Sequence, residues 1–301
     1  MNKNNLVRPI LHWAGGKRQL LGELSLLLPK EIEVYCEPFV GGGALFFNLQ
    51  PNIAYINDIN NDLICFYKVL KDDFDAFIFA LQEYKELIQK CEDESVFFYN
   101  IRNLDRDKEL YNSLSSVQKA ARLFYLNRKC YNGLFRVNSN GEFNAPFNRK
   151  HVCFINENII QCLRAVHEYL NTANVYMTSC DFEEVLKTIP KNTFVYLDPP
   201  YYVPVKKCGF TKYSKDGFNE QDHIRLRKCC DYLTANGIKF MLSNSDTDFI
   251  REQYSDYNIV VVKAKRSINS NSKGRGFVNE LIIRNYNELR KDITYNLFNI
   301  N

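Results

Sequence analysis

The spacing of apolar and polar residues along the chain predicts short strands that alternate with helices. The strand-like segments are short apolar runs that end in turn-forming residues. They cover residues 34–36, 53–56, 194–197, 238–242, 259–262 and 281–283. Apolar residues recur at helical spacing in segments between them, at 43–48, 63–70 and 223–234. This alternation indicates an α/β fold, in which crossover connections cover a sheet.

One long interval, from about residue 64 to 170, interrupts the alternation. It shows helical patterns at 74–90, 94–102 and 116–128, and then a stretch rich in Gly and Asn. Within 137–143, an Asn-Gly pair lies between apolar residues, which predicts a β-hairpin. We therefore expect an α/β domain made of residues 1–63 and 171–301. We expect residues 64–170 to form a mostly helical insertion, with the hairpin at about 130–150.

Composition and charge exclude several classes of protein. Among the 301 residues, 46% are hydrophobic and 25% are charged, which is typical of a folded globular chain and excludes gross disorder. The net charge of +4 permits a polyanionic partner without requiring one. The start of the chain shows no signal-peptide pattern, and no apolar run reaches the length of about 18 residues that a membrane span needs. We expect a cytoplasmic protein.

The ten cysteines show no paired spacing and no CxxC motif. We expect them to be reduced thiols, many of them in the core. The four histidines, His12, His151, His167 and His223, do not stand at metal-ligand spacing with a cysteine. A structural zinc site is therefore not expected.

Two polar or glycine-rich segments follow the first two predicted strands. Residues 37–43, EPFVGGG, form a glycine-rich turn that either lets a ligand approach the backbone or is only a tight turn. Asp58 follows the next strand, about 20 residues later, where a carboxylate accepts hydrogen bonds from ribose hydroxyls. The alternative for Asp58 is a helix N-cap. The spacing favours a nucleoside ligand over NADP, whose 2′-phosphate a carboxylate would repel.

Residues 198–201, DPPY, follow an apolar strand and carry the strongest signal. Asp198 and the carbonyl of Pro199 offer two acceptors for an exocyclic NH2 group, and Tyr201 offers a face on which a base stacks. The alternative is a proline turn with a surface tyrosine. A fourth segment, WAGGK at 13–17, contains the only tryptophan of the chain, and by itself it fits a turn beside a core Trp13.

Together these segments resemble the D12-class, Dam-like DNA adenine-N6 methyltransferases. Their shared order is WxGGK, (D/E)PFxGxG, an acidic residue after the second strand, a recognition insert, and DPPY. Further similarity to the adenine methylases of DpnII-type systems lies in RQLL, RVNS, FNAPF and MLSNS. The resemblance covers nearly the whole chain. It implies a Rossmann-like, S-adenosylmethionine-dependent methyltransferase sheet with an inserted target-recognition domain.

The resemblance also assigns roles to residues. It implies that Asp198, Pro199, Pro200 and Tyr201 form the catalytic segment, without a covalent enzyme intermediate. The residues implied to contact S-adenosyl-L-methionine are Trp13, Lys17, Glu37, Phe39, Gly41, Gly43, Asp58, Asp181, Phe182 and Asp198. The target adenine of double-stranded DNA is expected to be flipped out of the duplex.

Residues of the hairpin match the part of the family that reads GATC. These residues are Tyr131, Asn132, Leu134, Arg136 and Pro146, and Lys17 is implied to lie near the DNA as well. Arg136 is expected to contact a guanine edge and Leu134 a thymine methyl, the alternative for Arg136 being a solvated surface arginine. Basic residues that either contact phosphates or form a solvated face are Arg128, Lys129, Arg149, Lys150, Lys263, Lys265, Arg266, Lys273 and Arg275.

Two rival functions stay open. One is a methyltransferase that acts on adenine in another sequence, on RNA or on a protein amide; DPPY rather than NPPY argues against the amide. The other is a sequence-specific DNA-binding protein with a vestigial cofactor site. We expect a monomer or weak dimer, and a cognate restriction endonuclease, if the chain has one, would act on the same site without direct contact.

Overall fold

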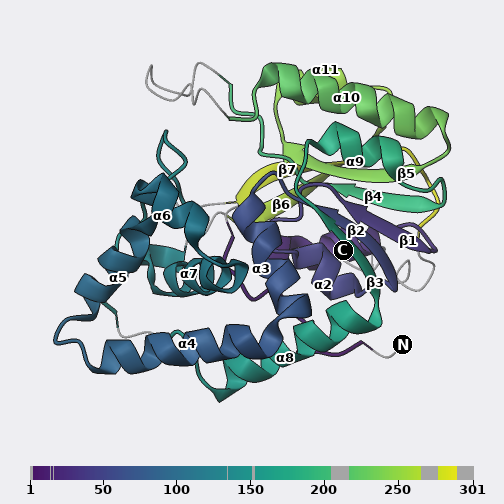
Figure 1. The fold of residues 1–301 in the computed structure, drawn as a ribbon. Coiled ribbons are helices and arrows are strands. Elements are labelled where there is room, and N and C mark those ends of the chain that lie inside the picture. The colour runs from purple at the N-terminus through teal and green to yellow at the C-terminus, as the bar shows by residue number, and fades with distance from the viewer. Residues whose placement is uncertain are drawn as a thin grey trace. The chain divides into compact units, whose positions relative to one another are not determined.

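The computed structural model describes residues 3–13, 15, 17–133, 135–150, 153–204, 217–265 and 277–289. The chain forms two compact units, each assembled from segments that are distant in sequence (Figure 1). The first contains Met1–Gly16, Gly41–Gln50 and Asp58–Ser179. The second contains Lys17–Val40, Pro51–Asn57 and Cys180–Asn301. The unit boundaries fall inside the WAGGK and EPFVGGG segments. The boundary between the catalytic and recognition domains stays a prediction.

A mixed sheet forms the centre of the second unit, with the order β2-β1-β4-β5-β7-β6. Its strands are β1 (Val34–Glu37), β2 (Ile53–Asn57), β4 (Thr193–Leu197), β5 (Lys239–Ser245), β6 (Asn258–Lys265) and β7 (Phe277–Arg284). The first four in this order pair in parallel, whereas β7 is antiparallel to both β5 and β6. Because β1 lies between β2 and β4, the chain reverses its direction of winding there, which is where α/β sheets bind ligands.

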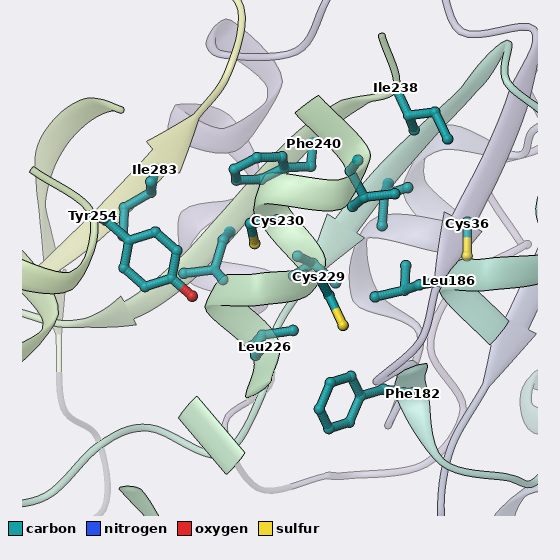
Figure 2. Close-up of a cluster of buried hydrophobic side chains, with 14 of the residues drawn as sticks. Cys36, Phe182, Leu186, Leu226, Cys229, Cys230, Ile238, Phe240, Tyr254 and Ile283 are labelled. Carbon is teal, nitrogen blue, oxygen red and sulfur yellow. The ribbon is translucent and has the colours of Figure 1, made fainter. Parts of the chain in front are cut away.

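Among the helices of the second unit, α9, α10 and α11 cover one face of this sheet (Figure 1). The unit contains η1 (Lys17–Leu20), α1 (Leu21–Leu26), α9 (Phe182–Thr188), α10 (Glu220–Ala235) and α11 (Asp248–Gln253). Side chains of α9, α10 and α11 pack on β1, β4, β5 and β7 in a cluster that includes Leu186, Cys230, Phe240 and Ile283 (Figure 2). Burial of this apolar surface fixes the strands whose carboxyl ends carry the candidate site.

The first unit is mostly helical. Its helices are α2 (Ala44–Leu49), α3 (Asn61–Asp72), α4 (Phe74–Gln89), α5 (Glu94–Asn103), α6 (Lys108–Ser113), α7 (Ser116–Lys129) and α8 (Glu157–Thr172). Shorter elements are the 3-10 turns η2 (Leu104–Arg106) and η3 (Tyr131–Gly133), and the strand β3 (Asn174–Thr178). Helix α3 packs against α7 and α8. Asn60 caps α3, and Ser115 with Gln118 forms a capping box on α7, so the sequence itself sets where these helices begin.

The predicted alternation of strands and helices is confirmed. Each predicted strand segment and each predicted helical segment overlaps an element of the same type. The predicted hairpin is also present: Val137 pairs with Phe143, and the N–H of Gly141 donates to the carbonyl of Asn138. The pattern missed the short helices α1, α6, α9 and α11 and the longer α8. Strand β5 extends through Ser245, beyond the predicted end at 242, because β7 pairs with it that far.

The cysteines in the described ranges are free thiols, and several are buried. Burial raises the pKa of Cys229 to about 11 and that of Cys130 to about 12. These thiols are therefore protonated at neutral pH and poor nucleophiles. Within the described ranges, no group of three His, Cys, Asp or Glu side chains stands ready to hold a metal ion. No helix in those ranges has both the length and the apolar character needed to cross a membrane.

Candidate active site and nucleic-acid interface

A buried ion pair marks the carboxyl end of β4 in the second unit. The ammonium of Lys17, the first residue of η1, lies 2.8 Å from Oδ1 of Asp198, which directly follows the strand. The side chain of Lys17 is 6% exposed and that of Asp198 is 18% exposed. Burial raises the pKa of Asp198, while the positive charge and hydrogen bond of Lys17 act in the opposite direction. Lys17 thus favours the ionised carboxylate.

Tyr201 lies beside this pair. The Lys17 ammonium is 4.5 Å from the centroid of its ring, which is cation–π distance. The Tyr201 hydroxyl donates a 2.6 Å hydrogen bond to Oε2 of Glu280 on β7. The DPPY segment therefore brings its carboxylate and its aromatic ring to one lysine. Within this segment, Pro199 is buried and Pro200 is exposed.

The ends of β1 and β2 carry two buried polar side chains. Glu37 ends β1, is 3% exposed, and accepts a 2.8 Å hydrogen bond from the Tyr35 hydroxyl. Asn57 ends β2, and its amide group donates to the carbonyls of Pro38 and Cys180 at 3.0 Å each. Its oxygen accepts from the Cys180 N–H at 3.0 Å. Asn57 therefore ties the turn after β1 to the segment that leads into α9.

A cluster of phenylalanine rings includes Phe39, which lies in the turn after β1. Phe39, Phe182 and Phe218 have their ring centroids within 5.3–5.7 Å of one another. Asp181 is the N-cap of α9, accepts from the Glu183 N–H, and forms a 2.8 Å ion pair with Arg225. This combination offers apolar faces for a planar ring and a carboxylate acceptor at its edge.

The glycine-rich turn continues into the first unit, where its glycines lie close to aromatic rings. Gly41 has φ +48°, and a Cβ there would lie 2.9 Å from Cδ1 of Trp13. Gly43 has φ +66°, and its Cβ would lie 2.8 Å from the Phe47 ring. Both positions therefore need glycine for backbone conformation and for space. Trp13 is half-buried and stacks on Phe135 with the ring centroids 4.6 Å apart.

The carboxylate of Asp58 binds backbone N–H groups of this glycine-rich turn and of the segment that follows β2. One carboxylate oxygen accepts the Gly41 N–H at 3.0 Å and the other accepts the Asn60 N–H at 2.9 Å. Burial raises the pKa of Asp58, and these backbone hydrogen bonds lower it. The N-cap of α3 is Asn60 rather than Asp58, so the N-cap alternative does not describe Asp58. The carboxylate instead shapes the glycine turn.

The hairpin of the first unit presents most of the proposed DNA-reading residues at its surface. Tyr131, Asn132, Arg136 and Pro146 are exposed, whereas Leu134 lies outside the described residues. The Tyr131 N–H donates to the Pro146 carbonyl at 2.8 Å. Arg136 donates through Nε to Oδ1 of Asn144 at 2.7 Å and through Nη2 to its carbonyl at 3.2 Å. The guanidinium is therefore held in one orientation on the hairpin.

A group of charged side chains, most of them buried, binds the backbone of the hairpin. Asp105 accepts the Phe143 N–H at 2.7 Å and pairs with Arg122 at 2.7 Å. Arg106 also pairs with Asp105 and donates to the Phe143 carbonyl at 2.7 Å. Both backbone groups of Phe143 are thus bound to η2. This leaves the strand that carries Asn144 little freedom to shift.

The basic residues do not all face solvent. Lys129 is 3% exposed and its ammonium lies 2.8 Å from the Glu94 carboxylate, so the prediction of a phosphate contact or solvated face is wrong for it. Arg128 is part-buried, and burial lowers its pKa. Arg149, Lys150 and Lys263 are exposed. The predicted phosphate contacts at Arg266, Lys273 and Arg275, and the side chain of Lys265, lie outside what the structure describes.

The sequence analysis assigned no role to several residues that these interactions involve. They are Asn57, Asp105, Asn144, Glu280 and Arg225. Asn57 had a signal, since it directly precedes Asp58 at the same strand end. Asn144 lies inside the FNAPF segment. Asp105, Glu280 and Arg225 had none, because only tertiary pairing reveals their partners.

Comparison with known proteins identifies relatives over most of the chain. The model of the family described as D12 class N6 adenine-specific DNA methyltransferase matches residues 13–268. The chain is 39% identical over 286 residues to the Type II methyltransferase M1.LlaDCHI of Lactococcus lactis subsp. cremoris, covering 95% of this chain and 97% of the relative. It is 41% identical to the Type II methyltransferase M.MjaIII of Methanocaldococcus jannaschii, with 93% and 99% covered. It is 33% identical to the DNA adenine methylase of Escherichia coli K12, with 94% and 95% covered.

Proposed function

Because the chain belongs to the D12 class of N6 adenine-specific DNA methyltransferases, we propose that it methylates the adenine of GATC in double-stranded DNA. The family membership makes it an enzyme that transfers a methyl group to adenine N6, and confirms the Rossmann-like methyltransferase fold expected from the sequence. The observation that carries the proposal is the arrangement of Lys17, Asp198 and Tyr201 at the end of β4. The GATC target, base flipping and the individual site residues belong to the proposal.

The family uses S-adenosyl-L-methionine as methyl donor, and the chemistry of this chain fits that molecule. The rings of Phe39 and Phe182, with the Asp181 carboxylate beside them, suit a purine and its exocyclic amine. Asp58 suits hydroxyl groups. The further proposed contacts are Trp13, Lys17, Glu37, Gly41, Gly43 and Asp198. When bound, this group would supply a methyl carbon on a positively charged sulfur, which leaves as a neutral thioether.

The residues of DPPY act on the nitrogen that attacks. The lone pair of adenine N6 is delocalised into the ring, which makes the amine a poor nucleophile. Asp198 and the Pro199 carbonyl accept hydrogen bonds from its two N–H groups and raise the electron density on nitrogen. One N6 proton has to leave once the N–C bond forms, and the raised pKa of Asp198 makes its carboxylate a better acceptor for it. Orientation of the two reactants supplies much of the remaining rate.

The target base has to leave the duplex to reach this pocket. Tyr201 offers a ring on which the flipped adenine stacks, and base–aromatic stacking contributes about 1–3 kcal/mol. The Lys17 ammonium lies 4.5 Å from the centroid of that ring, so a base stacked on Tyr201 would lie close to Lys17. Lys17 is therefore proposed to serve both the cofactor and the DNA.

The hairpin is proposed to read the sequence around the adenine. Arg136 contacts a guanine edge, and a bidentate contact of this kind discriminates by about 1–3 kcal/mol. Tyr131, Asn132 and Pro146 are exposed as well, and Leu134 is proposed to contact the thymine methyl. The orientation of Arg136 by Asn144 supports this role, since a fixed guanidinium loses little entropy on binding.

The wider assignments follow the family. Residues 1–63 and 171–301 are proposed as the catalytic domain and 64–170 as the target-recognition part. We propose that the enzyme works in the cytoplasm as a monomer or weak dimer. If it belongs to a restriction system, its endonuclease partner acts on the same DNA site and does not bind this chain.

Tritium transfer tests the activity and its target. Labelled S-adenosylmethionine is incubated with a GATC duplex, a GATC duplex already methylated on both adenines, a duplex with one base of GATC changed, and an RNA of the same sequence. We expect label in the first substrate and background in the others. Equal label in the first two duplexes, or label in none, contradicts the proposal. Preferential labelling of RNA supports the rival methyltransferase function.

Asp198→Ala tests the catalytic segment. We expect this variant to lose transfer while its affinity for S-adenosylmethionine, measured by calorimetry, largely survives. Glu252→Ala, which removes an exposed carboxylate on α11 of the same unit, is the matched control and should retain transfer. Wild-type turnover by Asp198→Ala would refute the assigned role. Binding of GATC duplexes by the wild type without any transfer would instead favour the DNA-binding rival.

A further inference from the structure

We propose that Glu280 is a positioning residue for the target adenine, acting through Tyr201. This inference rests on the proposed stacking of the flipped base on Tyr201. Glu280 lies on β7, opposite Ser245 of β5 and Val262 of β6, so paired strands hold its backbone on both sides. Its carboxylate accepts the Tyr201 hydroxyl at 2.6 Å, a short, charge-assisted hydrogen bond.

The hydrogen bond fixes the ring of Tyr201 at the end remote from its backbone. A tyrosine in a loop can otherwise rotate about its side-chain bonds, and a rotating ring is a poor stacking surface. The anionic partner also donates electron density into the phenol through its hydroxyl. That strengthens the attraction between the ring and the Lys17 ammonium, 4.5 Å from its centroid. Glu280 thus holds both the direction of the ring and its contact with Lys17.

The backbone next to Tyr201 is held from the same edge of the sheet. The Tyr202 N–H donates to Oδ1 of Asn244 at 3.1 Å, and the Ser245 hydroxyl donates to the Tyr202 carbonyl at 2.7 Å. With the backbone fixed by β5, the remaining freedom of Tyr201 lies in its side chain. Glu280 removes that freedom. The β5 residues therefore fix the backbone, and Glu280 fixes the ring on which the base is proposed to stack.

Glu280 also acts on Asp198 through its charge. Burial, the largest effect, raises the pKa of Asp198, the Lys17 ammonium lowers it, and the negative charge of Glu280 raises it further. Among the described residues, Tyr196 on β4 and Tyr201 also interact electrostatically with Asp198. Loss of the Glu280 charge therefore lowers the pKa of Asp198. A residue that only stabilises the fold would leave this pKa unchanged.

Three variants test the proposal: Glu280→Ala, Glu280→Gln and Tyr201→Phe. Removal of a hydrogen bond to a charged group predicts that Glu280→Ala lowers kcat on a GATC duplex roughly 10- to 100-fold. The affinity for S-adenosylmethionine should change little. Tyr201→Phe should lose a similar factor, and the double variant Glu280→Ala/Tyr201→Phe should lose no more than either single one. Multiplicative losses would overturn the proposal.

Glu280→Gln separates the hydrogen bond from the charge. Its amide oxygen still accepts the Tyr201 hydroxyl, so we expect it to recover most of the rate that Glu280→Ala loses. We also expect the acid limb of its kcat/KM profile to move to lower pH. If Glu280→Ala keeps wild-type kcat on a duplex that the wild type methylates, this inference fails and the proposed function stands. If the wild type transfers no methyl group, the proposed function itself fails.

Discussion

The Lys17 ammonium and the Asp198 carboxylate form a 2.8 Å ion pair, although one begins a 3-10 turn near the N-terminus and the other follows a central strand. The two side chains come from the WAGGK and DPPY segments. Nothing in the spacing of these segments along the sequence requires them to be in contact. Burial opposes ionisation of Asp198, and the lysine opposes that effect. Lys17 therefore sets the pH range over which Asp198 carries its charge.

Replacement of Lys17 by Met removes this charge while keeping an unbranched side chain. The pKa of Asp198 should then rise further above its usual range, because burial is no longer offset. Since we propose that the ionised carboxylate is the active form, the acid limb of kcat/KM should move to higher pH. Lys228→Met, on the exposed side of α10, is the control. An unchanged acid limb in Lys17→Met would contradict this role.

The glycine turn predicts a graded series of alanine variants. Gly43→Ala combines a positive φ of +66° with a Cβ only 2.8 Å from the Phe47 ring, and should destabilise the protein by at least about 1 kcal/mol. Gly141→Ala has the positive φ of +76° but open space, so it should cost less. Gly22→Ala, in α1 with open space and no positive φ, should be neutral or stabilise by about 0.4–1 kcal/mol. Urea unfolding of the three variants measures the order, and equal effects would refute it.

The sequence predicts the sheet and the motifs well because both depend on local signals. Apolar runs that end in turn residues locate β1, β2 and β4, and a buried parallel sheet permits few other patterns. The motif residues Asp198 and Tyr201 then lie together at a strand end, as the DPPY segment indicates.

The partners of those residues are less accessible to sequence analysis. Glu280 reaches Tyr201 from β7, which pairs with β5 in antiparallel fashion, and Lys129 is buried in an ion pair with Glu94. A basic residue beside a proposed DNA-reading loop and a basic residue in a buried ion pair look the same in sequence. Pairing across the fold, rather than residue type, decides between them.

Asp105 should control both stability and target discrimination. Asp105→Asn leaves the charge of Arg122, whose side chain is 4% exposed, without its carboxylate, and breaking such a pair costs about 3–5 kcal/mol. It also weakens the support of Phe143, so the hairpin should discriminate less between GATC and duplexes with one base changed. Denaturant unfolding and the ratio of kcat/KM values measure the two effects. Asp75→Asn, on the exposed side of α4, is the control, and equal behaviour of the two variants would argue against this support.

His223 should make stability depend on pH. His223 is 1% exposed, both ring nitrogens lack a hydrogen-bond partner among the described residues, and Phe218 packs against the ring with the centroids 4.7 Å apart. Burial lowers the pKa of His223 to about 4, while the neighbouring Asp222 acts weakly in the opposite direction. The unfolded chain therefore binds a proton at a higher pH than the folded one. The contribution of this pKa shift to the free energy of unfolding is fully present above about pH 6.5 and is lost as the pH falls towards 4.

His223→Phe keeps a ring of similar size and cannot be protonated. The free energy of unfolding should then fall less between pH 7 and pH 4.5 than it does in the wild type, with a difference of up to about 3 kcal/mol. Urea unfolding at several pH values provides the measurement. Because carboxylates elsewhere titrate in both proteins, the difference between the two curves isolates His223. Parallel curves over this pH range would show that His223 is protonated in the folded state as readily as in the unfolded chain.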